Sequence, residues 1–260
     1  MGSKSRLCKN GAWACMELPV MNYSRALLMQ QHLVSARAER TLHQDVVIFL
    51  QHFPVFTLGN RGGAEHLHVS GEFLKERGIE IVETGRGGSI TYHGPGQLVV
   101  YPIVNLARSG WKVPDFVRAL ETVMICTARR WGLEAQSGDS QRGVWVNGRK
   151  IGSVGLRVSR RISFHGFALN ADLDLSPFSW VTPCGLSGVQ MTSIAEETGL
   201  PVPIDEVTQA AKQNFSRVFG VSLEPAPDFL FKDWQGQEES HFHEFIIPSA
   251  DLPYSGLGQA

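Results

Sequence analysis

Cysteines are few in this sequence of 260 residues, and they form no recognisable metal or disulfide motif. Cys8, Cys15, Cys126 and Cys184 stand at irregular spacings without a Cys-x-x-Cys pair. Such spacing argues against a zinc knot and against the disulfide framework of a small secreted protein. We therefore expect reduced thiols in a cytoplasmic protein, with an organelle matrix as the alternative.

A strong charge imbalance and long apolar runs are also missing. The 24 basic and 25 acidic residues give a net charge of -1, which predicts no broad basic face for nucleic acid or anionic lipid. The longest apolar run, from Leu98 to Ile103, is far too short to span a membrane. The N-terminus shows no basic segment followed by a long apolar stretch. We therefore expect a soluble protein without nucleic-acid or membrane partners.

The sequence does contain enough apolar residues, at 43%, for one large domain with a sizeable core. Helix and strand signals alternate without an internal repeat, which predicts an α+β or α/β domain. Expected helices are Tyr23–Arg40, Glu72–Arg77, Pro114 to Gly132, a short helix from Ser193, and Asp205–Phe219; expected strands are Val46–Gln51, Ile79–Glu83 and Leu98–Ile103. Thr57–Gly63 reads as a loop, and Asn147-Gly148 predicts a hairpin over Val144–Ile151 because this pair adopts positive φ angles readily.

The segment from Arg86 to Gln97 carries the strongest indication of a binding site. Its glycines allow close approach of a ligand to backbone N–H groups, which suits a carbonyl or an anion. Pro95-Gly96 fits the centre of a type II turn, with His93 at its mouth. The segment matches neither a phosphate-binding loop nor a dinucleotide fingerprint. A tight structural hairpin is the alternative.

Cys184 is a candidate nucleophile because Pro183 and Gly185 favour its presentation on a turn. A thiol with a pKa of about 8.5 needs a nearby base or cation to react at neutral pH. In the predicted hairpin Lys150 faces Trp145, where desolvation would lower the lysine pKa. His165 is the competing base, although it also fits a core histidine among phenylalanines. A buried structural cysteine and a solvated lysine are the alternatives for this pair.

Four segments together resemble the lipoyl(octanoyl) transferases. They are Arg86-Gly87-Gly88 with Thr91 to Gln97, then Lys150 to Gly155, then Phe164 to Asn170, then Pro183-Cys184-Gly185, in the order and at the spacings of that family. The similarity covers residues 13–223, which we expect to form the catalytic domain. Residues 224–260 are unmatched and are expected to be a partly disordered or loosely docked extension.

The resemblance implies an α+β fold like that of biotin and lipoate protein ligases, a mixed sheet flanked by helices in a single domain. It also implies an acyltransferase that uses octanoyl-acyl carrier protein as donor. The acceptors would be lysines on lipoyl domains of 2-oxoacid dehydrogenase complexes and on the glycine cleavage H protein. Cys184 would carry the acyl group as a thioester and Lys150 would act with it. The substrate pocket would be lined by Arg86, Gly87, Gly88, Ser89, Ile90, Thr91, Tyr92, His93, Ser153, Val154, Gly155, Gly166, Phe167 and Ala168.

Neither a cofactor nor a metal is expected, because exchange of thioesters followed by amide formation needs no nucleotide. The longer loop at Gly138–Arg142 departs from the family pattern at the pocket rim. Other hypotheses remain: an ATP-dependent lipoate or biotin ligase that uses the glycine segment for an adenylate, a non-catalytic binder, or a cysteine hydrolase using His165. Metal binding by His241-Phe242-His243-Glu244 is disfavoured because short histidine pairs in polar tails are usually solvated.

Overall fold

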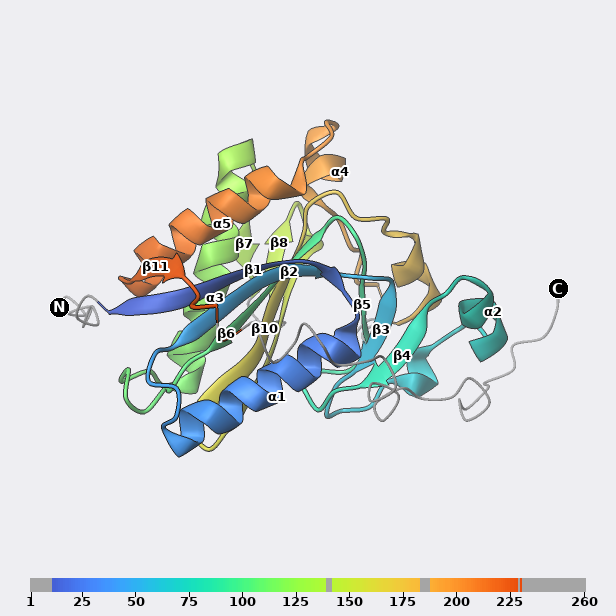
Figure 1. Cartoon of the computed structure of the whole chain (residues 1–260). Coiled ribbons are helices and arrows are strands. Elements are labelled where there is room, and N and C mark those ends of the chain that lie inside the picture. The colour runs from blue at the N-terminus through green and yellow to red at the C-terminus, as the bar shows by residue number, and fades with distance from the viewer. Residues whose placement is uncertain (1–10, 139–141, 183–187, 229, 231–260) are drawn as a thin grey trace, which may run out of the picture.

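A computed structural model describes residues 11–138, 142–182, 188–228 and 230. Its centre is a mixed eight-stranded sheet in the order β11-β1-β2-β6-β10-β9-β8-β7 (Figure 1). The strands are β1 (Ala12–Met21), β2 (Val46–His52), β6 (Gln97–Ile103), β7 (Gln136–Ser137), β8 (Val144–Val146), β9 (Arg149–Ser159), β10 (Ile162–Asn170) and β11 (Ser222–Pro225). A second sheet of three strands lies beside it, with β3 (Val55–Leu58) between β4 (Glu80–Glu83) and β5 (Thr91–His93).

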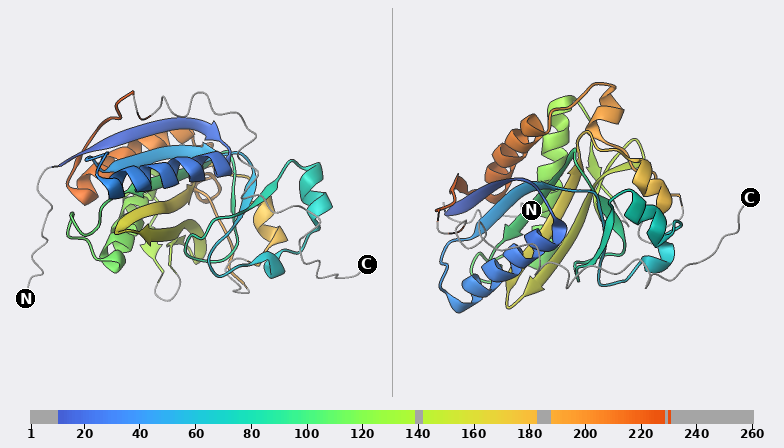
Figure 2. Two further views of the ribbon diagram at one scale, coloured as in Figure 1. Left: turned by 60° about the horizontal axis from the view of Figure 1, so that its bottom comes forward. Right: turned by 45° about the vertical axis from the view of Figure 1, so that its right-hand side comes forward.

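Helices cover both faces of the large sheet (Figures 1 and 2). One face packs against α1 (Tyr23–Glu39), and the other packs against α3 (Val113–Ala128) and α5 (Ile204–Phe219). Two short helices, α2 (Gly71–Glu76) and α4 (Ile194–Thr198), lie at the periphery with the 3₁₀ turns η1 (Ala64–His66), η2 (Arg129–Trp131) and η3 (Ser176–Trp180). This arrangement confirms the predicted α+β class.

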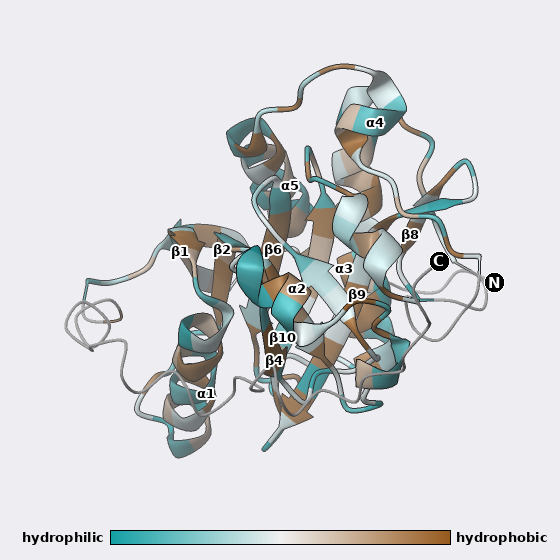
Figure 3. Ribbon diagram, turned by 90° about the vertical axis from the view of Figure 1, so that its right-hand side faces the viewer, coloured by the Kyte–Doolittle hydropathy of each residue, from teal (hydrophilic) through white to brown (hydrophobic). Residues whose placement is uncertain are grey.

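Alternation along the central strands divides the core into two layers. In β2, Val47 and Phe49 pack on the side of α3 and α5, whereas Val46, Ile48 and Leu50 pack on the side of α1. Both faces of this strand are buried, so it reads as a continuous apolar run (Figure 3). A third apolar cluster fills the space between the small sheet, α2 and η3.

The predicted glycine turn joins the two sheets. Gly96 has a φ of 85°, and the Gln97 amide donates to the Gly94 carbonyl over 3.2 Å. The strands on either side do not pair with each other, because β5 pairs with β3 and β6 pairs with β2 and β10. The simple structural hairpin is therefore wrong, and the turn instead carries the chain from the small sheet into the large one.

The helices agree with the predictions to within a few residues, and so does the Asn147-Gly148 hairpin. Asn147 and Gly148 both have positive φ, and Trp145 pairs with Lys150 as expected. Strands β1, β3, β7, β10 and β11 were not predicted; β3 includes Thr57, which the sequence placed in a loop. Within the described ranges, no helix combines the length and apolar character that crossing a bilayer requires. The predicted division at residue 223 stays a prediction, although β11 extends to Pro225.

Candidate active site

A cavity of about 730 Å³ lies where the two sheets meet the N-terminal ends of α1 and α3. Among the predicted pocket residues, those that line it are Arg86, Gly87, Gly88, Ser89, Ile90, Thr91, His93, Ser153, Val154, Gly155, Gly166, Phe167 and Ala168, together with Lys150. Three segments far apart in the sequence therefore meet at one hollow. Its volume is within the range of small-molecule sites.

Tyr92 is the exception among the predicted lining residues. It lies in β5 between Thr91 and His93, which both line the cavity, and successive side chains of a strand point to opposite faces. Its ring packs instead against Phe56 and Phe178, with centroids 5.3 and 5.8 Å away. Tyr92 thus belongs to the core of the small sheet.

The glycine segment is held tightly against β9. The Gly87 amide donates to the Leu156 carbonyl over 3.2 Å, so this N–H is already used by the protein. A Cβ on Gly155 would lie 3.0 Å from the Gly87 carbonyl oxygen, closer than an ordinary van der Waals contact. Arg86 is buried and donates through Nη2 to the Thr57 carbonyl over 2.6 Å and through Nε to Thr57 Oγ1 over 3.0 Å. The segment is therefore a fixed wall of the cavity.

Lys150, near the start of β9, also lines the cavity and is 8% exposed. Its Nζ lies 5.5 Å from the centroid of the Trp145 ring, which confirms the predicted hairpin pairing. Gly143 packs against the same side chain, since a Cβ there would come within 2.7 Å of Lys150 Cε. The lysine amine is thus held between an indole and a bare backbone segment.

Cys184 lies outside the described residues, but the segments on both sides of residues 183–187 are described. On one side the Thr182 amide donates to the His66 carbonyl over 2.9 Å. On the other, the Lys150 amide donates to the Gln190 carbonyl over 2.8 Å, and the Thr192 amide donates to the Lys150 carbonyl over 2.9 Å. The segment that follows Cys184 in the sequence is therefore paired with the backbone of Lys150.

His165 lines the cavity through an unusual backbone conformation. It has a φ of 53° within β10, and its ring stacks on the adjacent Phe164 at 4.7 Å. Two consecutive residues thus present their rings on the same side of the strand. The buried Gln30 side chain accepts the His165 N–H over 2.7 Å. Strain of this kind persists only where surrounding contacts impose it.

The cavity wall near His165 is polar, which the sequence did not indicate. Tyr23 Oη lies 3.3 Å from His165 Nδ1, and Tyr101 Oη lies 2.7 Å from Nε2 of the neighbouring His52. Tyr23, Tyr101 and His165 all line the cavity. Tyr23 and His165 are 142 residues apart, so no local pattern could have paired them.

Burial keeps these histidines neutral. It is the main cause that lowers the pKa of His52 to about 4 and, with Arg86 and Arg157, the pKa of His165 to about 3. Burial, His52 and Arg86 lower the pKa of His93 well below its ordinary value. Imidazoles with such values are weak bases at neutral pH.

Register also separates His165 from Lys150. His165 pairs with Leu156, which lies six residues beyond Lys150 along β9, a distance of about 20 Å at the usual rise of a strand. The two candidate bases therefore occupy opposite ends of the cavity. Arg142, from the loop expected at the pocket rim, also lines the cavity. Other lining residues that the sequence did not indicate are Tyr23, Arg61, Val99, Tyr101, Val113, Pro114, Val117, Leu156 and Val189.

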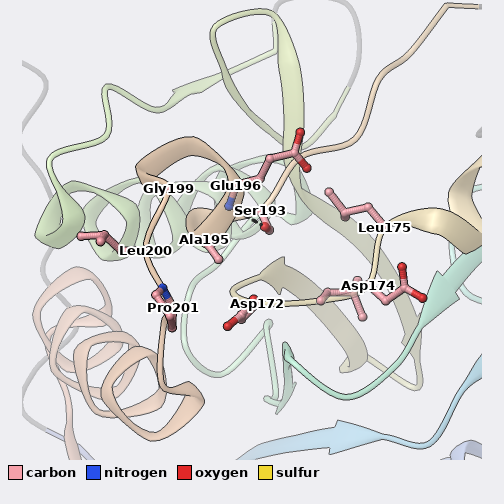
Figure 4. A pocket seen from close by; sticks show the side chains of 10 residues that line it. Asp172, Asp174, Leu175, Ser193, Ala195, Glu196, Gly199, Leu200 and Pro201 are labelled. Atoms are coloured by element: carbon pink, nitrogen blue, oxygen red, sulfur yellow. Dashed lines mark hydrogen bonds between the residues drawn. The ribbon is translucent and has the colours of Figure 1, made fainter.

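A second hollow of about 420 Å³ lies between the end of β10 and α4 (Figure 4). Three carboxylates, those of Asp172, Asp174 and Glu196, line it. Asp172 accepts from the Val202 amide over 3.3 Å, and Asp174 accepts from the Ser176 amide over 2.9 Å. Glu196 pairs with Arg149 over 2.7 Å, so all three carboxylates have partners within the protein.

Similar proteins agree with this geometry. The fold is that of the lipoate-protein ligases: a lipoate-protein ligase A crystallised with ATP has a TM-score of 0.70 at 16% identity, covering 88% of this chain and 98% of its own. A putative lipoate protein ligase from T. acidophilum with bound lipoic acid has a TM-score of 0.68 at 17% identity, covering 86% of this chain and 92% of its own.

The family model described as "Lipoyl protein ligase A/B catalytic domain" matches residues 22–216. An octanoyltransferase of Desulfotalea psychrophila is 43% identical over 79% of this chain and 93% of its own length. The octanoyltransferase of Syntrophobacter fumaroxidans is 41% identical over 78% of this chain and 89% of its own length. The chain belongs to the lipoyl protein ligase A/B family and, within it, to the octanoyltransferases, and it is an acyltransferase. The predicted resemblance is thereby confirmed.

Proposed function

We propose that this chain moves an octanoyl group from octanoyl-acyl carrier protein to a lysine of a lipoyl domain, through a thioester on Cys184. The observation that supports this most is the pairing of Lys150 with residues 190–192. Because that segment follows Cys184 in the chain, Lys150 is the buried basic side chain best placed to serve the thiol. Lipoyl domains of 2-oxoacid dehydrogenase complexes and the glycine cleavage H protein are the proposed acceptors.

The reaction takes place in two balanced steps. In the first, Lys150 takes the Cys184 proton, the sulfur attacks the octanoyl thioester, and the carrier thiol leaves with that proton. In the second, Lys150 takes a proton from the acceptor ammonium, whose amine attacks the Cys184 thioester and forms an amide. The second amine proton passes to the leaving sulfur, so Cys184 returns as the thiol, and Lys150 releases the proton it took to solvent. The first step exchanges one thioester for another and the second runs downhill, so neither needs ATP.

The octanoyl chain would bind in the cavity beside Val154, Phe167 and Ala168. Burial of each methylene contributes about 0.8 kcal/mol, so eight carbons suffice for firm binding. Selectivity between neighbouring chain lengths is modest, because one methylene changes the free energy by about 1–3 kcal/mol.

Intact mass spectrometry tests the thioester directly. We expect the protein incubated with octanoyl-acyl carrier protein and no ATP to gain the mass of one octanoyl group, and Cys184→Ser not to gain it. Addition of a lipoyl domain should then discharge the wild-type adduct. A strict need for ATP with an active Cys184→Ser variant would instead identify a ligase, and release of free octanoate would identify a hydrolase.

Lys150 is tested by replacement with Ala. We expect loading of Cys184 to slow by about 10²–10⁴-fold, the usual contribution of a general base, with the fold retained. Lys212→Ala is the matched control, because Lys212 pairs with Glu17 and does not line the cavity. Loading of Lys150→Ala at close to the wild-type rate at neutral pH would assign the base to another group.

A further inference from the structure

A buried chain of side-chain hydrogen bonds connects the acyl cavity with the segment that flanks Lys150. His93, which lines the cavity, has its Nδ1 2.6 Å from Gln97 Oε1. Gln97 Nε2 donates to Asn170 Oδ1 over 2.9 Å, and Asn170 Nδ2 donates to the Thr192 carbonyl over 2.8 Å. Thr192 in turn donates its amide to the Lys150 carbonyl.

Neither amide in the middle of this chain touches the cavity. Gln97 and Asn170 are 2% and 1% exposed, and neither is among the residues that line the hollow. Their side chains therefore cannot contact the acyl group that the cavity holds. Both carboxamide groups are committed to protein partners, so they can act only through what they hold.

What they hold is a segment that meets β9 over a short stretch and packs Met191 against the apolar cluster of the small sheet. Residues 190–192 form no named strand and touch β9 through a single bridge between Lys150 and Met191. The Asn170 side chain fixes this segment from the other side, through the Thr192 carbonyl. The Asn170 side chain thus adds a side-chain anchor to the two backbone hydrogen bonds that join this segment to Lys150.

We propose that Asn170, oriented by Gln97, is a positioning residue that keeps residues 190–192 in register with Lys150. This inference rests on the proposed function. Proton transfer between a thiol and an amine needs placement to within a fraction of an ångström, and loose placement slows a reaction even when binding is intact. Asn170 therefore controls the reaction rate and not the affinity of the cavity.

The test compares Asn170→Ala with Asn214→Ala, a buried asparagine between α5 and α3 that does not line the cavity. We expect Asn170→Ala to load octanoyl on Cys184 at least tenfold more slowly, with the dissociation constant for octanoate within twofold of wild type. Asn214→Ala should load normally. A normal loading rate in Asn170→Ala, or an equal loss in the control, overturns the proposal.

A second variant covers the case in which Asn170→Ala does not fold. Gln97→Met removes the support of Asn170 while leaving its bond to Thr192 intact. We expect a loss of loading rate that is smaller than for Asn170→Ala. A wild-type rate for this variant contradicts the part assigned to Gln97.

Alkylation of Cys184 by iodoacetamide, mapped by mass spectrometry, separates this inference from the proposed function. If wild type fails to load octanoyl, the transfer proposal falls, but alkylation still reports the surroundings of the thiol. We expect the apparent pKa for alkylation of Cys184 to lie below the ordinary thiol value of about 8.5 in wild type and to return toward it in Asn170→Ala. An unchanged pH profile of alkylation overturns the positioning role.

Discussion

At the scale of single residues, the site depends on glycines that leave space for reactive side chains as much as on the reactive side chains themselves. Gly143 has a φ of 124°, and its amide donates to the buried carboxylate of Glu121 over 2.9 Å. A Cβ there would lie 2.4 Å from the Gly152 carbonyl oxygen and 2.7 Å from Lys150 Cε. Lys150 therefore owes its position in part to a residue without a side chain.

Gly143→Ala should accordingly separate positioning from backbone strain. We expect a loss of about 3 kcal/mol of unfolding free energy, from the positive φ and the collision with the Gly152 carbonyl together. Loading of Cys184 should be at least tenfold slower because Lys150 must move. Gly110→Ala is the control, with a φ of 73° and no atom within 4 Å of its Cβ position. Urea unfolding and loading rates check both variants, and equal loading in the two would contradict the role of Gly143.

The buried histidines predict how stability depends on pH. The pKa of His52 is lowered to about 4 and that of His165 to about 3, whereas in the unfolded chain each is about 6.5. Between these pKa values the unfolded state binds more protons than the folded state. The contribution of the neutral histidines to stability is therefore fully present above about pH 6.5 and falls as the pH decreases. Each of these two histidines should lower the free energy of unfolding by about 2 kcal/mol between pH 7 and pH 5.

Urea unfolding over this pH range measures the effect. His52→Gln should flatten the pH dependence, because glutamine cannot be protonated and can still bond with Met21 and Tyr101, the partners of His52. His32→Gln gives the comparison for a histidine outside this cluster. A wild-type stability that stays constant from pH 7 to pH 5 would show that these imidazoles are accessible to protons in the folded state.

At the scale of elements, the turn at Gly96 decides how the two sheets meet. The Gly96 carbonyl accepts from the amides of Ala171 and Asp172, and its amide donates to Gln51 Oε1 over 2.8 Å. A Cβ on Gly96 would lie 2.1 Å from the Asp172 carbonyl oxygen. The turn is thereby fastened to β2 and to the end of β10.

Gly96→Ala should therefore be among the most damaging single changes in this chain. We expect about 3 kcal/mol of lost stability, from the positive φ and the backbone collision together. Gly199→Ala, at the end of α4, has a φ of 70° and open space around its Cβ position, so it should lose only about 1 kcal/mol. If urea unfolding shows equal losses of unfolding free energy for Gly96→Ala and Gly199→Ala, the backbone near Asp172 moves aside at little cost.

At the scale of the whole molecule, local signals were readable from the sequence and long-range pairings were not. The Trp145–Lys150 pair follows from a two-residue turn, so it could be derived from neighbouring residues alone. The polar wall around Tyr23 and His165 joins residues from α1 and β10, which no periodicity relates. The turn at Pro95-Gly96 could also be predicted from neighbouring residues. The strands that it connects could not, because they depend on the pairing within both sheets.

The position of the cavity between the sheets leads to a last prediction about the whole fold. Saturation with octanoate at a hundred times its dissociation constant should stabilise the bound state by about 2.7 kcal/mol. Amides of the glycine segment and of β9 near Gly155 form walls of the cavity, so their hydrogen exchange should slow by up to about hundredfold where exchange requires the ligand to leave. Exchange near Asp172 and Leu200, at the second hollow, should not change.

Mass spectrometry of peptides after hydrogen exchange distinguishes the two hollows in one experiment. Because the glycine segment leads into β5 in the small sheet and β9 belongs to the large one, protection of both peptides means that the acyl chain lies between the sheets. Protection of only one would place the chain against a single wall, outside the cavity. Protection at Asp172 and Leu200 instead would assign acyl binding to the acidic hollow and separate it from Lys150.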